Sequence, residues 1–318
     1  MAGRGTAPGG AVGHAAWQAR DVSTDPPTAP PTRSMPTPPL LPEARRVGST
    51  DGVELAVYDF GGTGQDALLA HANGFCAGVM APLARELRPW HCVAFDSRAH
   101  GRSSSPEGSM AWEGHRDDVL AVLDRTGLER PVGIGHSMGG AALLLAEQHR
   151  PGTFAALWLF EPIVFPPMAE LPPGENPLAA GAARRRVRFD SKDAAYANFA
   201  RKAPLDELSP ECLAAYVEHG FAPTEDEAVV LRCSPEAEAE GYRMGTRHGA
   251  WDALGSIRCP VVVARGAETE PGPASMAPMV ADRLPHGRLE EHPELGHFGP
   301  LADPAGVARS VRAVVEQG

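Results

Sequence analysis

The sequence has few cysteines, no long apolar run and no excess of basic residues. Its five cysteines are scattered over 318 residues without a C-x-x-C pair, which favours buried thiols in a reducing compartment over a disulfide framework. No apolar run approaches the roughly 18 residues of a membrane span, and residues 1–20 lack the apolar core of a secretory signal. The formal net charge of −11 disfavours nucleic-acid and membrane partners, because both bind basic surfaces. We therefore expect a cytoplasmic protein.

Residues 1–44 are rich in Gly, Ala, Thr and Pro, with eight prolines between Pro26 and Pro42. Such a run neither nucleates a helix nor fills a sheet, so it predicts a disordered extension. All recognisable structure follows Met35, which makes Met35 an alternative start of the native protein.

Beyond residue 44, short apolar runs alternate with helical patterns. Strands are expected near residues 46–47, 53–58, 67–70, 92–95, 132–136, 155–160, 260–266 and 287–291. Alternating strands and helices predict a mostly parallel, eight-stranded sheet with helices on both faces. The alternation stops over residues 163–256, where only helical patterns recur. We expect a helical cap there, inserted between core segments 45–162 and 257–318.

Residues 132–142 carry the strongest functional signal. They contain Gly135-His136-Ser137-Met138-Gly139 between an apolar run and a helical pattern, which is the setting of a nucleophile elbow. Small flanking residues suit a serine held on a tight, strained turn. A helix that begins at Met138 would also direct its N-terminus at developing negative charge. These features predict Ser137 as a nucleophile.

Four motifs occur in a fixed order along the chain. They are His71-Ala-Asn-Gly-Phe75, Asp96-x-Arg98-x-His100-Gly101-x-Ser103, Gly135-x-Ser137-x-Gly139-Gly140 and Gly296-His297-Phe298. With them the chain resembles the α/β-hydrolase superfamily from about residue 46 to its end. The form of the first motif and the cap resemble a bacterial and fungal subgroup of capped hydrolases. The resemblance implies an α/β-hydrolase fold.

The resemblance implies His297 as the base that takes the proton of Ser137. A carboxylate should orient its imidazole and stabilise the charged form. The superfamily supplies this acid after the seventh strand, where the loop holds Glu268 and Glu270. Some members carry it after the sixth strand, where Glu161 ends an apolar run. Glu161 and Glu270 are both candidates, with Glu268 as a third.

An oxyanion hole needs the backbone N–H of the residue after the nucleophile, Met138, and one from the turn after the third strand. Asn73 is the expected second donor and Gly74 the alternative, because this turn is longer than the usual His-Gly form. The Asn73 side-chain amide is a further candidate for facing the substrate. A buried structural network beneath the site is expected from Asp96, Arg98 and His100.

The cap should set substrate choice, because pockets in this architecture form between cap and sheet. Its aromatic residues favour an apolar substrate group or, given their helical spacing, a core: Phe189, Tyr196, Phe199, Tyr216 and Phe221. The arginines at 184–186 and 188 are expected on a solvated face, with recognition of a substrate carboxylate as the alternative.

Together these residues predict a serine hydrolase that acts on a small-molecule ester or lactone through an acyl-enzyme. No metal or other cofactor is expected, since no H-x-x-x-H or H-E-x-x-H pattern occurs. The same triad is compatible with acyl transfer, carbon–carbon bond hydrolysis or perhydrolysis. A non-catalytic ligand-binding protein on the same fold is the alternative from another class. The oligomeric state stays open.

Overall fold

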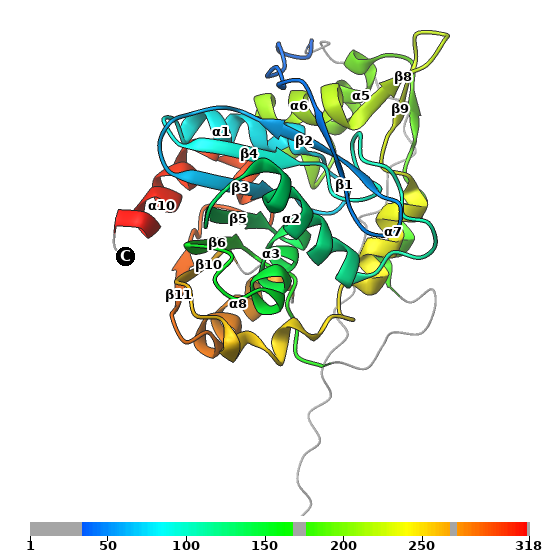
Figure 1. Ribbon diagram of the computed structural model, residues 1–318. Helices are drawn as coiled ribbons and strands as arrows, with labels where there is room; N and C mark the ends of the chain where they lie inside the picture. The colour runs from blue at the N-terminus through cyan, green and yellow to red at the C-terminus, as the bar shows by residue number, and fades with distance from the viewer. Residues whose placement is uncertain (1–33, 168–175, 268–271, 317–318) are drawn as a thin grey trace, which may run out of the picture.

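Eight short strands form one sheet through the middle of the molecule (Figure 1). The computed structural model describes residues 34–167, 176–267 and 272–316. The strands are β1 (Arg45–Gly48), β2 (Glu54–Asp59), β3 (Asp66–Ala70), β4 (His91–Phe95), β5 (Val132–His136), β6 (Ala156–Phe160), β10 (Val261–Arg265) and β11 (Gly287–Glu291). Their spatial order is β1-β2-β4-β3-β5-β6-β10-β11. Strand β2 pairs antiparallel with β1 and β4, and all later neighbours are parallel. The predicted sheet is thus confirmed.

Helices cover both faces of this sheet, as predicted (Figure 1). One face carries η1 (Ala77–Met80), α1 (Ala81–Glu86) and α10 (Pro304–Glu316), and the other carries α2 (Trp112–Thr126), α3 (Met138–His149) and α8 (Pro273–Arg283). Because successive strand residues point to opposite faces, Leu69 packs in the same cluster as Leu83, and Leu68 packs in the cluster of Leu143. The short helix α9 (Gly299–Ala302) precedes α10.

The expected cap segment, residues 163–256, contains more than helices. Its helical elements are α4 (Pro177–Ala183), α5 (Lys192–Phe199), η2 (Leu205–Glu207), α6 (Pro210–Gly220), α7 (Pro235–Met244), η3 (Gly249–Trp251) and η4 (Leu254–Ser256). It also contains a three-stranded antiparallel sheet of β7 (Arg188–Phe189), β9 (Val229–Leu231) and β8 (Phe221–Pro223). The sequence did not predict these strands, because two or three residues are too few to show alternation. The five cap aromatics are buried in one cluster, so they belong to the core of this segment.

Residues 34–44, part of the predicted disordered extension, lie against the cap segment without forming a helix or strand. The Met35 N–H donates to Asp193 Oδ1 at 3.1 Å, and His219 Nε2–H donates to the Pro39 carbonyl at 2.9 Å. Met35 and Leu41 also pack against the buried cluster. Residues 1–33 lie outside the described part of the chain. In the part described, no helix combines the length and apolar character that crossing a membrane requires.

Candidate active site

Strand β5 leads into helix α3 through a strained turn at Ser137. The Ser137 backbone has φ 54° and ψ −113°, a conformation that residues with a side chain rarely adopt and that is common at functional sites. The turn is crowded. A Cβ on Gly139 would overlap the Ala70 carbonyl oxygen, and a Cβ on Gly135 would lie 2.6 Å from the Gly140 Cα. Glycine is therefore required on both sides, as the elbow motif predicted.

The imidazole of His297 is hydrogen-bonded to the carboxylate of Glu161. The His297 Nδ1–H donates to Glu161 Oε2 at 2.6 Å, and the Gly266 N–H donates to Oε1 at 2.9 Å. The Glu161 side chain is 2 % exposed and that of His297 is 29 % exposed. Glu161 has φ 45°, so the chain bends sharply where β6 ends. With Nδ1 protonated, Nε2 of His297 is the ring nitrogen available to accept a proton.

His297 is also hydrogen-bonded to the nucleophile elbow. The Nε2–H of His136, the residue before Ser137, donates to the His297 carbonyl at 2.7 Å. The two imidazole rings lie 5.1 Å apart between centroids. These contacts bring the segment after β11 to the residue next to the serine. Glu268 and Glu270, the other candidates for the acid, lie outside the described residues.

The two candidates for the second oxyanion donor differ in their backbone bonding. The Gly74 N–H already donates to His100 Nε2 at 3.0 Å. For the Asn73 and Met138 N–H groups, by contrast, no acceptor is found within the described residues. One N–H of the Asn73 side-chain amide donates to the Glu238 carbonyl in α7 at 2.9 Å. This bonding favours the Asn73 backbone amide over that of Gly74.

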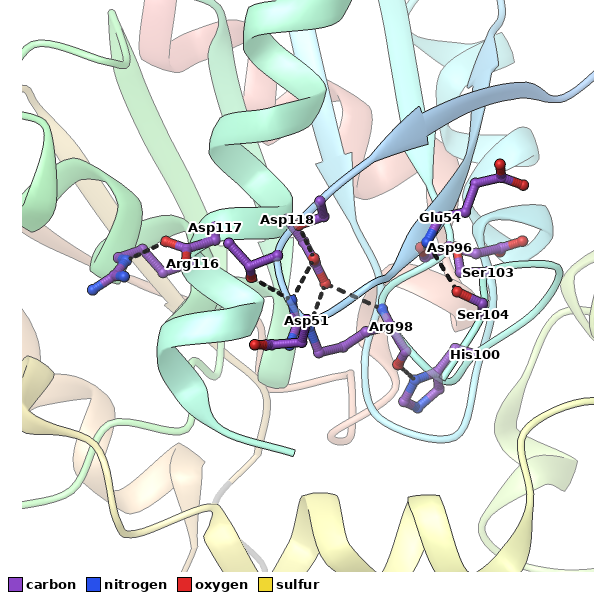
Figure 2. A network of polar contacts seen from close by, with 12 residues as sticks. Asp51, Glu54, Asp96, Arg98, His100, Ser103, Ser104, Arg116, Asp117 and Asp118 are labelled. Carbon is purple, nitrogen blue, oxygen red and sulfur yellow. Dashed lines mark hydrogen bonds and ion pairs between the residues drawn. The ribbon is translucent and has the colours of Figure 1, made fainter. Parts of the chain in front are cut away.

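A buried ion pair joins Arg98, in the turn after β4, to Asp118 of α2 (Figure 2). The guanidinium of Arg98, fully buried, donates twice to Asp118 at 2.9 Å. The Arg98 carbonyl accepts from His100 Nδ1–H at 2.8 Å, which leaves His100 Nε2 to accept from Gly74. The sequence predicted Arg98 and His100 as structural, but it gave no signal for Asp118, which looks like an ordinary surface charge of α2.

Asp96 belongs to the buried polar network beneath the site, as expected from the sequence. Its carboxylate accepts from the Tyr58 hydroxyl at 2.9 Å, the Ala77 N–H at 2.7 Å and the Arg102 N–H at 2.8 Å. Burial raises the pKa of this carboxyl, although the hydrogen bonds oppose the shift. Asp96 thus ties the turn after β4 to η1 and β2.

Two buried histidines join the turns after β3 and β4. His71 Nε2 accepts from the Ser97 N–H at 3.0 Å, and His100 Nε2 accepts from Gly74. Burial lowers the pKa of each from 6.5 to about 4. Both rings are therefore neutral near pH 7, which is the state in which Nε2 accepts a hydrogen bond.

We expect the protein to lose stability as the pH falls from about 6.5 to about 4. In this window the unfolded chain binds protons at His71 and His100 that the folded chain does not. The free energy of unfolding therefore decreases as the pH is lowered. Each pKa unit corresponds to about 1.4 kcal/mol. Urea unfolding midpoints at pH 7, 5.5 and 4.5 should decrease in that order. Replacement of the exposed His286 by Gln should not change this dependence, and equal midpoints would contradict the expectation.

The expectation for the arginine run was wrong at one position. Arg184, Arg186 and Arg188 are exposed, whereas Arg185 is largely buried. Its guanidinium donates to Glu238 Oε2 and to the Tyr216 hydroxyl, each at 2.5 Å. Three consecutive arginines, at positions 184–186, give no periodicity that would identify the inward-facing one.

Comparison with known proteins agrees with this architecture. A model described as the alpha/beta hydrolase family matches residues 67–310. The chain belongs to this family. The epoxide hydrolase A of Mycobacterium tuberculosis is 33 % identical to this alpha/beta hydrolase over 137 residues, which cover 40 % of the chain and 41 % of that protein. The match thus spans about two fifths of that relative's length.

Two further matches extend over more of this alpha/beta hydrolase. A non-heme chloroperoxidase of Streptomyces lividans is 25 % identical over 230 residues, which cover 65 % of the chain and 78 % of that protein. The crystal structure of E-2-(acetamidomethylene)succinate hydrolase superposes with a TM-score of 0.71 at 21 % identity, covering 86 % of this chain and 98 % of that one. At this identity the likeness shows the fold alone, whereas the family match over residues 67–310 confirms the resemblance to the α/β-hydrolase superfamily.

Proposed function

We propose that this alpha/beta hydrolase is a serine hydrolase acting on a small-molecule ester or lactone. Ser137 is the nucleophile, His297 the general base and Glu161 the acid of the triad. The observation that carries the proposal is the 2.6 Å hydrogen bond between His297 and the buried Glu161, at a histidine attached to the nucleophile elbow. A histidine whose Nδ1–H is held by a buried carboxylate keeps Nε2 free to accept a proton, which supports its assignment as the general base.

The proposed reaction proceeds through an acyl-enzyme. The Ser137 Oγ attacks the acyl carbon while His297 Nε2 accepts its proton, and Glu161 stabilises the resulting imidazolium. The N–H groups of Met138 and Asn73 donate to the oxyanion. His297 then protonates the leaving alcohol, and a water molecule that it deprotonates releases the acid. These steps need no cofactor.

The identity of the nucleophile separates this proposal from epoxide hydrolysis and dehalogenation. An epoxide hydrolase or dehalogenase of this fold would carry aspartate at the elbow, where this chain has Ser137. Serine favours acyl chemistry. Perhydrolysis is the second candidate, because it uses the same triad and one relative is named as a bifunctional esterase/perhydrolase.

A fluorophosphonate probe tests the proposal directly. We expect a covalent adduct at Ser137, located by mass spectrometry of the peptide that carries it, because only an activated serine attacks phosphorus readily. The adduct should be absent from heat-denatured protein and strongly reduced in His297→Gln. An unlabelled Ser137, or equal labelling of native and denatured protein, would favour a binding protein. Comparing p-nitrophenyl esters with lactones then identifies the substrate class.

A further inference from the structure

Helix α7 of the cap segment lies directly on the side chain of Asn73. The Glu238 carbonyl of α7 accepts from Asn73 Nδ2 at 2.9 Å. One turn later, Gly241 is buried, and a Cβ at this position would lie 2.5 Å from Asn73 Oδ1. Only glycine allows the helix to approach this closely. The contact therefore depends on both a hydrogen bond and the missing side chain of Gly241.

The same helix also contacts Gly74. The Glu238 side chain is nearly buried, and its Oε1 lies 2.7 Å from where a Cβ on Gly74 would stand. Arg185, two residues after the end of α4, donates to the other carboxylate oxygen of Glu238 and to the Tyr216 hydroxyl of α6. Arg185 thus connects α7 to α6 and fixes the Glu238 carboxylate next to Gly74.

On the side of the β3 turn that lies away from α7, His100 of the sheet domain binds Gly74. The Gly74 N–H donates to His100 Nε2 at 3.0 Å. His100 in turn is fixed by the Arg98 carbonyl. Asn73 and Gly74 therefore sit between a rigid network of the core and a helix of the cap.

We propose that α7 is a positioning element of the oxyanion hole, with Gly241 and Glu238 as its positioning residues. The inference rests on the proposed function, in which the Asn73 N–H donates to the oxyanion. Fixing the Asn73 side chain fixes the rotation of its peptide and so the direction of that N–H. A preorganised donor stabilises the transition state more than the ground state. A displaced α7 therefore lowers kcat and leaves KM nearly unchanged.

Gly241→Ala tests this, with Gly181→Ala as the matched control. Both glycines lie in cap helices, but a Cβ on Gly181 meets nothing within 4 Å. Alanine favours helix at either position, so a loss confined to Gly241→Ala reports the contact with Asn73. With a p-nitrophenyl ester, we expect kcat to fall about tenfold in Gly241→Ala, less than the 10²–10³-fold for a lost donor. KM should stay within about twofold of wild type, and Gly181→Ala should match wild type.

Asn73→Ala completes a double-mutant cycle. Alone, it removes the hydrogen bond to Glu238 without a clash, and it should also lower kcat with little change in KM. In the Asn73→Ala background, Gly241→Ala should cost less than about twofold, because the coupled partner is gone. Equal losses in both backgrounds, or wild-type kcat in both single variants, would overturn the inference. A wild-type protein without esterase activity or adduct would instead contradict the proposed function.

Discussion

Ser137→Ala is expected to lower kcat about 10⁶-fold, and His297→Ala by a similar factor, because the two groups act as one unit. The serine cannot attack without a base, and the base has no function without the serine. The double variant should therefore be no slower than either single variant. The measurement is steady-state hydrolysis of a p-nitrophenyl ester by all three variants, with the uncatalysed reaction as reference.

Additive losses in this series would show that the two residues act in separate steps. Residual catalysis of about 10³-fold over water should remain in every variant, since the oxyanion donors and substrate binding are intact. His286→Gln is the control for histidine replacement as such, because this residue is exposed.

Glu161→Gln is expected to lower kcat by about 10³–10⁴-fold with little change in KM. The carboxylate is 2.6 Å from His297 Nδ1, so an amide in its place stops stabilising the imidazolium and can present an N–H to a ring nitrogen that should donate. Oε1 would still accept from the Gly266 N–H, which preserves the end of β10. The measurement is kcat and KM with the same ester.

Glu270→Gln and Glu268→Gln are the matched comparisons, because they make the same chemical change at the other acidic positions. We expect both to stay within about threefold of wild type, because the proposed acid, Glu161, is intact in each variant. A large loss in Glu270→Gln together with an active Glu161→Gln would move the triad acid to the loop after β10. Thermal unfolding of all three variants separates catalytic from structural loss.

The sequence predicted the sheet because its inner strands are buried on both faces and read as short apolar runs between helical patterns. Ser137 was recognisable because a side chain at Gly135 or Gly139 would clash with neighbouring atoms. Both positions therefore require glycine, and the resulting Gly-x-Ser-x-Gly spacing can be seen in the sequence. His297 became a candidate only through resemblance, since one histidine among 12 has no local signature.

The sequence could not choose between Glu161 and Glu270, because both follow strands that end at the same edge of the sheet. The contact with His297 depends on how far the loop at residues 296–299 reaches, which is a tertiary property. Neither the role of Asp118 nor the burial of Arg185 could be predicted from the sequence. Each is a charged residue whose partner lies far away in sequence, at Arg98 and Glu238 respectively.

The position of β10 and β11 beyond β6 has a consequence for synthesis on the ribosome. Strand β6 is made before the cap segment, and its parallel neighbour β10 only after it. A nascent chain therefore carries an open hydrogen-bonding edge on β6, next to the finished elbow, while the cap emerges. His297 leaves the ribosome later still, so the elbow stays without its proposed base until the segment after β11 has emerged.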